Sequence, residues 1–123
     1  MYKFENLEVY QLALTYADLT YGLATELPRS EESNLKSQMV RAATSIVLNI
    51  AEGSTSQTDS EQRRFLSMAI RSLMETVACQ HLIERRRYSG RDVLTKGYEL
   101  SEVLFGKLQA MRRVLKSNKA KDL

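Results

Sequence analysis

Apolar and polar residues recur along residues 38–53 with the period of an α-helix. On a helical wheel of about 100° per residue, the apolar residues fill one broad sector and the polar residues form one narrow stripe. The apolar sector contains Met39, Ala42, Ala43, Ile46, Val47 and Ile50, and the polar stripe contains Gln38, Arg41, Ser45, Asn49 and Glu52. Three interpretations of the stripe stay open: a polar seam inside an assembly, a wall that faces a ligand, or the solvent side of the helix.

Start and stop signals bound this helix and the one before it. The first predicted helix runs from about residue 6 to residue 27, because Pro28 pushes the residue before it out of helical geometry. The second runs from about residue 33 to Gly53, which we interpret as its C′ residue.

Two more helices follow in the second half of the chain. Thr58 and Glu61 have the spacing of a capping box and predict a third helix that continues to about Arg87. After residues 88–90, a fourth helix carries one regular apolar stripe that we expect in the core. The stripe contains Val93, Gly97, Leu100, Leu104, Leu108, Met111 and Leu115.

The first predicted helix differs from the others because it has two apolar stripes on nearly opposite sides. One stripe contains Leu7, Tyr10, Leu14, Ala17, Tyr21 and Ala24, and the other contains Val9, Leu12, Tyr16, Leu19 and Leu23. An ordinary surface helix buries one stripe roughly 100° wide or a little more. We therefore expect the second stripe to face away from the helix's own bundle and to form an interface between subunits.

Four long helices joined by short loops predict an all-α fold, an antiparallel up-down-up-down four-helix bundle. The length of 123 residues fits one domain over residues 1–123 with a single core, followed by a frayed basic tail from about residue 117. Neither an apolar leader segment nor a membrane-spanning run is present, so we expect no membrane contact and a cytoplasmic location. A single cysteine, Cys79, suits a reducing compartment and is expected in the core.

Few residues offer catalytic or metal chemistry. His81 is the only histidine, and Ala78 occupies the position where a Glu-x-x-His metal motif needs glutamate. No glycine-rich phosphate loop follows a strand. We therefore expect no catalytic residues, no metal, no cofactor and no enzymatic activity.

The two halves of the chain differ in their balance of basic and acidic residues. Residues 1–61 contain 4 Lys/Arg and 9 Asp/Glu, whereas residues 62–123 contain 14 Lys/Arg and 6 Asp/Glu. This asymmetry predicts either a basic face that attracts phosphate or helices that neutralise each other side by side. The candidate nucleic-acid-binding residues are Arg63, Arg64, Arg71, Arg85, Arg86, Arg87, Arg112, Arg113, Lys116, Lys119 and Lys121. We expect the larger cluster where the third helix begins and the fourth ends.

Motifs spread over most of the chain resemble the four-helix-bundle family of 23S rRNA intervening-sequence proteins. They include Gln38-x-x-Arg41-Ala-Ala-x-Ser45-Ile, Asn49-Ile-Ala-Glu52-Gly53, Phe65-Leu66-x-x-Ala69 and Ser72-Leu-x-Glu75, with Phe4-x-x-Leu7, Val9-Tyr10-Gln11 and Pro28 before them. The sequence departs from the family at Tyr10, where tryptophan is usual, and at Ala42, where a second arginine often follows the first.

The resemblance implies a homopentameric ring with a central channel. It also implies kinship with accessory proteins of diversity-generating retroelements, which bind a reverse transcriptase and its RNA. We therefore expect a non-enzymatic, ring-forming scaffold that binds nucleic acid, with structured RNA favoured over DNA. The alternative is an adaptor whose partner is a reverse transcriptase or another protein, without a physiological nucleic-acid ligand.

Overall fold

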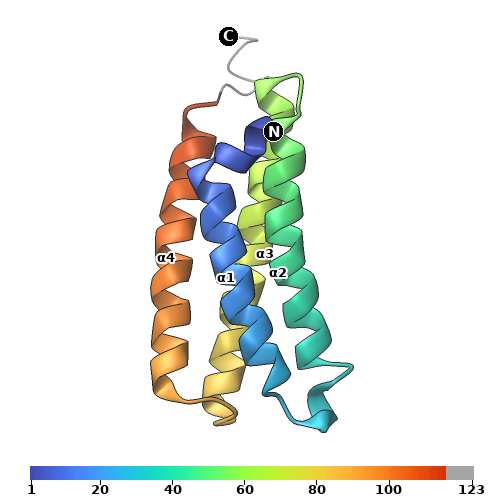
Figure 1. Cartoon of the computed structure of the whole chain (residues 1–123), viewed down its shortest axis with the longest axis vertical. Coiled ribbons are helices and arrows are strands. Elements are labelled where there is room, and N and C mark those ends of the chain that lie inside the picture. The colour runs from blue at the N-terminus through green and yellow to red at the C-terminus, as the bar shows by residue number, and fades with distance from the viewer. Residues whose placement is uncertain (116–123) are drawn as a thin grey trace.

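The computed structural model describes residues 1–115, and four α-helices dominate it (Figure 1). They are α1 (Glu8–Thr25), α2 (Leu35–Ser54), α3 (Asp59–Arg85) and α4 (Arg91–Arg113). Two short 3-10 helices, Lys3–Asn6 and Arg29–Glu31, precede α1 and α2. No strand occurs among the described residues, so the predicted all-α class is confirmed. None of these helices is long and apolar enough to cross a membrane.

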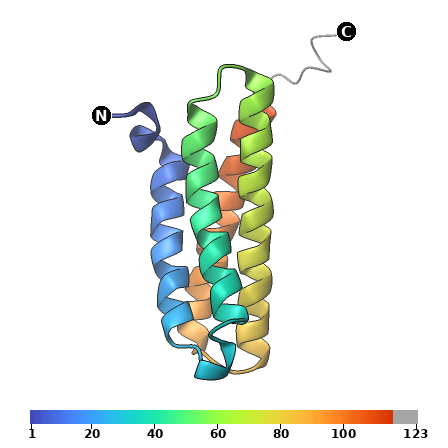
Figure 2. The same ribbon diagram turned by 90° about the vertical axis from the view of Figure 1, so that its right-hand side faces the viewer.

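The four helices lie side by side along the long axis of the molecule. In Figures 1 and 2 the chain runs down α1, up α2, down α3 and up α4. Each helix contacts the two helices beside it, so α1 packs against both α2 and α4. The loops between α1 and α2 and between α3 and α4 therefore meet at the same end of the molecule (Figure 1).

Local features account for three of the helix boundaries. Helix α1 ends at Thr25, ahead of Pro28. The side chain of Thr58 accepts a hydrogen bond from the backbone N–H of Glu61 at 3.1 Å, so the predicted N-cap of α3 is confirmed. At the other end of α3, Arg87 adopts a left-handed conformation with φ 58°, and the N–H of Tyr88 donates to the carbonyl of Ile83.

Gly53 has a different role from the one predicted. Helix α2 continues through it to Ser54, and its φ is not positive, so the prediction that it ends the helix as a C′ residue is wrong. Gly53 is buried, and a Cβ at this position would lie 3.0 Å from the Cβ of Phe65. The absence of a side chain allows α2 and α3 to approach closely near the loop that joins them.

The core consists of two apolar clusters along the bundle axis. The larger cluster includes Tyr16, Ile50, Leu73 and Leu104, and therefore draws on all four helices. The smaller cluster lies toward the loops between α1 and α2 and between α3 and α4, and it includes Leu23 and Met39.

The second apolar stripe of α1 belongs to the chain's own core. Val9, Tyr16 and Leu23 are buried, and Leu12 and Leu19 pack against the two clusters. The expectation that this stripe faces away from the bundle as a subunit interface is therefore wrong. The reason is that α1 contacts helices on two sides, which widens its buried surface. In the other stripe, Leu14 and Tyr21 are 36% and 40% exposed.

The apolar stripe of α4 lies in the core along most of its length. Gly97, Leu104 and Leu108 are buried. Three other members of the stripe pack against the core from partly buried positions: Leu100, Met111 and Leu115. Val93 is 40% exposed and Leu94 is buried in its place, so the prediction of a core position for Val93 is wrong.

Candidate nucleic-acid interface

Three arginines meet where α3 begins and α4 ends. Arg63 on α3 donates from Nη1 to the backbone carbonyl oxygens of Arg112 (2.6 Å) and Leu115 (3.2 Å). Arg112 donates in turn from Nη1 to the Ser67 hydroxyl oxygen at 3.1 Å. Carbonyl groups at the end of a helix lack intrahelical partners and carry the negative end of the helix dipole. Arg63 therefore caps α4, and the hydrogen bonds hold two guanidinium groups in place.

A hollow of about 260 Å³ lies at this end of the bundle and is lined by Arg63, Gln109, Arg112 and Arg113. Each of these side chains carries N–H donors, and no carboxylate is among them. Guanidinium groups donate in a planar fork that matches phosphate oxygens. The hollow, which we call the arginine hollow, is thus suited to an anion.

Two further candidates lie along α3, outside the arginine hollow. Arg64 and Arg71 are exposed. The guanidinium carbon of Arg64 lies 5.3 Å from the ring centroid of Phe65, a cation–π contact. Both charges are available to a ligand that extends along the outer side of α3.

The second group of arginines lies at the opposite end of the bundle. Arg85, Arg86 and Arg87 are exposed where α3 ends, and Arg87 lines a hollow of about 300 Å³ together with Arg91. Glu84 lines the same hollow, so its carboxylate offsets part of the positive charge. This end is therefore a weaker anion site than the arginine hollow.

A hydrogen bond between the two loops stabilises this opposite end. The Tyr88 hydroxyl donates to Oε2 of Glu31 at 3.0 Å. Hydrogen bonds from Asn34 and from Tyr88 lower the pKa of Glu31, and the bond to Glu31 raises the pKa of Tyr88. The remaining basic candidates, Lys116, Lys119 and Lys121, lie outside the described residues.

Two residues of the polar stripe on α2 bond to each other, and one of them also bonds to α3. Asn49 is only 8% exposed, and its Nδ2 donates to the carbonyl oxygen (2.8 Å) and the hydroxyl oxygen (2.9 Å) of Ser45. The Ser72 hydroxyl on α3 donates to the Ser45 hydroxyl oxygen at 2.8 Å. At Ser45 and Asn49 the stripe is therefore a polar seam within the chain, and the solvent-side interpretation does not hold for Asn49.

The other members of the stripe are exposed. Gln38 donates from Nε2 to Oδ1 of Asn34 at 2.9 Å. Arg41 and Glu52 line a hollow of about 390 Å³ together with Leu48, which is 53% exposed. Neither charge forms an ion pair with another described residue. The stripe thus combines an internal seam with a charged outer surface.

The structure contains a buried polar network that the sequence analysis did not predict. Tyr16, Thr76 and Gln80 have no exposed surface and form hydrogen bonds with one another across α1 and α3. Gly97 on α4 leaves space for the Gln80 amide, since a Cβ there would contact Gln80 Oε1. The sequence feature that could have indicated this network is the spacing of Thr76 and Gln80, two polar residues four positions apart on one face of α3.

His81 and Cys79 have no catalytic surroundings among the described residues. His81 is exposed, with its ring centroid 5.6 Å from that of Tyr98. Cys79 is buried as predicted, and burial raises the pKa of its thiol, which disfavours the reactive thiolate. No group of three His, Cys, Asp or Glu residues that could hold a metal ion occurs within residues 1–115.

The fold and this surface define an all-helical protein with an arginine-lined end. The family model of the 23S rRNA-intervening sequence protein matches residues 5–110, so the chain belongs to this family and the resemblance is confirmed. No curated protein matches the sequence.

The fold is also similar to a solved structure, that of a protein with unknown function from the S23 ribosomal protein family of Bacteroides thetaiotaomicron. The TM-score is 0.79 at 23% sequence identity, and the similarity covers 86% of this chain and 99% of that chain. At this level of identity the likeness shows the fold alone.

Proposed function

We propose that this chain is a non-enzymatic scaffold, an antiparallel up-down-up-down four-helix bundle, that binds structured RNA through phosphate contacts. The observation that carries the proposal is the arginine hollow, which presents three guanidinium groups and an amide without a carboxylate. Phosphate contacts supply much of the affinity of proteins for nucleic acids.

Two of the three guanidinium groups are ordered before any ligand arrives. Arg63 is bonded to the end of α4 and Arg112 to Ser67, so binding would restrict their side chains little further. Arg113 is exposed and can adapt to the position of a phosphate. Preorganised groups lose less conformational entropy on binding, which favours affinity at this end over the opposite end.

A salt series tests the RNA proposal. A hairpin RNA is titrated by gel shift with wild-type protein and with the double variant Arg112→Gln/Arg113→Gln. Each lost phosphate contact lowers the slope of log K against log salt by about 0.9 for a duplex, so we expect a decrease of about 2. The matched control, Arg86→Gln/Arg87→Gln, removes the same charge at the other end and should change the slope less. Equal slopes for all three proteins would overturn the proposal.

We also propose that the chain assembles into a homopentameric ring, as the family resemblance implies. Exposed apolar side chains on the outer surfaces of α2 and α4 support self-association: Leu48 is 53% exposed and Val103 47%. Light scattering after size exclusion should give five times the mass of one chain. A monomer at tens of micromolar would contradict this.

The second candidate function is a protein-interaction adaptor, with a reverse transcriptase or another protein as its partner. Met68, Met74 and Leu82 favour it, because they leave about two fifths of their surface exposed on α3. Methionine is common at surfaces that bind proteins, since its flexible side chain adapts to different partners. An unchanged RNA salt slope in the experiment above would favour the adaptor.

A further inference from the structure

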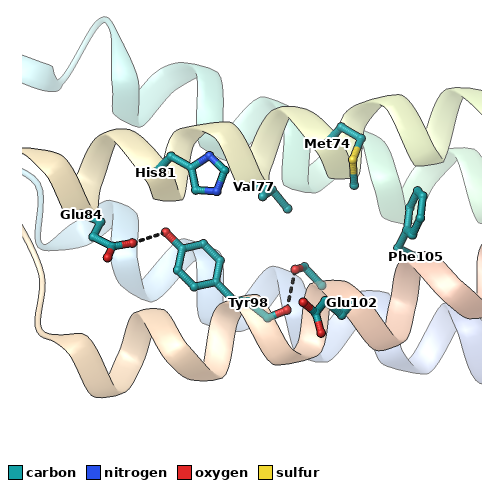
Figure 3. A pocket seen from close by; sticks show the side chains of 8 residues that line it. Met74, Val77, His81, Glu84, Tyr98, Glu102 and Phe105 are labelled. Carbon is teal, nitrogen blue, oxygen red and sulfur yellow. Dashed lines mark hydrogen bonds between the residues drawn. The ribbon is translucent and has the colours of Figure 1, made fainter.

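A second kind of hollow lies between α3 and α4, on the side of the bundle shown in Figure 3. Its volume is about 400 Å³, within the range of roughly 300–1,000 Å³ typical of small-molecule sites. Met74 and Val77 of α3 and Phe105 of α4 supply apolar walls. In Figure 3, Met74 and Phe105 lie at the end of the hollow away from Glu84.

The other end of the hollow is polar and acidic. The Tyr98 hydroxyl donates to Oε1 of Glu84 at 2.7 Å, and His81 lies against the Tyr98 ring (Figure 3). Glu102 lines the hollow from α4. No lysine or arginine lines it, and neither Glu84 nor Glu102 forms an ion pair with another described residue. Burial and the neighbouring Glu84 raise the pKa of Tyr98, so its hydroxyl stays protonated at neutral pH.

These features select a ligand by charge and by shape. Neither carboxylate forms an ion pair among the described residues, although Glu84 also borders the hollow of Arg87 and Arg91. The two carboxylates therefore attract a cation, and the aromatic ring of Tyr98 adds a cation–π contact. The acidic and histidine side chains here do not form a metal-binding group, so a bare metal ion does not fit. The apolar walls instead require a cation with a hydrocarbon body.

We propose that this hollow binds a small organic cation, an alkyl- or arylalkylammonium. Its ammonium group lies against the Tyr98 ring, with the carboxylates of Glu84 and Glu102 on either side, and its hydrocarbon body packs against Phe105 and Met74 (Figure 3). The hollow is bounded by the bond between Tyr98 and Glu84 at one end and by Phe105 at the other, and its volume suits a free small molecule. The site is separate from the arginine hollow, so its test is independent of RNA binding.

The test compares 2-phenylethylammonium with 2-phenylethanol, which has the same ring and chain without the charge. Both are titrated into the full-length protein, and binding is followed by amide NMR shifts of residues 74–84 and 98–105. Attraction to two nearby exposed carboxylates and one cation–π contact together predict an affinity on the order of tenfold higher for the amine. Equal affinities would overturn the proposal.

Matched variants test whether Glu84 and Glu102 are the carboxylates that attract the ammonium group. Glu84→Gln and Glu102→Gln should each weaken amine binding severalfold while leaving the affinity for the alcohol unchanged. Glu99→Gln is the control, because Glu99 is exposed on the same helix as Glu102 and does not line the hollow. A loss of affinity in Glu99→Gln as large as that in Glu102→Gln would show nonspecific attraction and overturn the site. Tighter binding of a lysine-containing peptide than of the free amine would overturn the assignment to a small molecule.

Discussion

The phenolic oxygen of Tyr16 on α1 lies 2.8 Å from the hydroxyl oxygen of Thr76 on α3. The Tyr16 oxygen accepts a hydrogen bond from Nε2 of Gln80 at 2.6 Å, and the Thr76 hydroxyl donates to the carbonyl of Leu73 at 2.6 Å. With the hydrogen of Thr76 directed to Leu73, Tyr16 must be the donor to Thr76. The hydrogen bonds therefore run in one direction from Gln80 to Leu73, an arrangement in which each bond polarises the next.

Replacing Tyr16 by phenylalanine should lower the free energy of unfolding by about 1–3 kcal/mol. The change leaves a buried N–H of Gln80 without its acceptor, and an unsatisfied buried donor costs about that much. Urea unfolding measures the effect. Tyr10→Phe is the control, since the Tyr10 hydroxyl has no hydrogen bond to another described residue, and it should cost less than about 0.5 kcal/mol. Equal stabilities of the two variants would contradict a structural role for the network.

Stability should fall at alkaline pH. Burial raises the pKa of Tyr16 from 10.0 to about 12, so folding favours the protonated phenol. The contribution is fully present below pH 10 and is lost as the pH rises from 10 to 12. At a shift of about two pKa units it amounts to roughly 2–3 kcal/mol. Unfolding measured between pH 9 and 12 should show a shallower decline in Tyr16→Phe than in wild type. Cys79, Tyr88 and Tyr98, whose pKa values are also raised, contribute to the decline that remains.

Gly97→Ala should destabilise the protein although alanine is the better helix former. The new Cβ would contact Gln80 Oε1, and the buried Gln80 side chain would have to move away from Tyr16. Gly106→Ala on the same helix is the control: Gly106 is exposed, with nothing near its Cβ position, and the change should stabilise by roughly 0.5–1 kcal/mol. Thermal unfolding separates the two outcomes, and a gain in Tm for both variants would contradict the close fit at Gly97.

Leu19→Glu should destabilise the folded chain itself, whatever its assembly state. Leu19 is partly buried against the smaller core cluster, so a carboxylate there would lose part of its hydration without a partner. Leu14→Glu, at a 36% exposed position on the same helix, should be tolerated. Circular dichroism and thermal unfolding test this difference. Full helicity and an unchanged Tm in Leu19→Glu would restore the interpretation of the second stripe as an external surface.

Asn49→Leu should cost about 1–3 kcal/mol, because it removes the amide from the polar seam with Ser45. Arg41→Ala should change the stability of the folded chain by no more than about 0.5 kcal/mol, since Arg41 is exposed and has no ion-pair partner among the described residues. Denaturant unfolding of both variants, with sizing, distinguishes an internal seam from a contact with another subunit.

The helices and several of their ends could be predicted from the sequence because their signals are local. Pro28 restricts the residue before it, and Thr58 satisfies the first backbone N–H groups of α3, whatever the rest of the chain does. In the candidate interface, the sequence predicted that Arg63 lies near Arg112 and Arg113, because antiparallel neighbouring helices bring the start of α3 beside the end of α4. It did not predict that Arg63 caps α4, because the direction of the Arg63 side chain depends on packing.

The sequence by itself determined four amphipathic helices, and only the tertiary structure decided which of their faces are buried. The periodicity of α1 shows that it has two apolar stripes, but it does not show which helices pack against each stripe. Because α1 packs against both α2 and α4, Tyr16 is buried while Leu14 stays partly exposed. The same limit applies to the polar core. Tyr16 lies 60 residues from Thr76 and 64 from Gln80 along the chain, and hydrogen bonds over such separations arise only once the helices pack together.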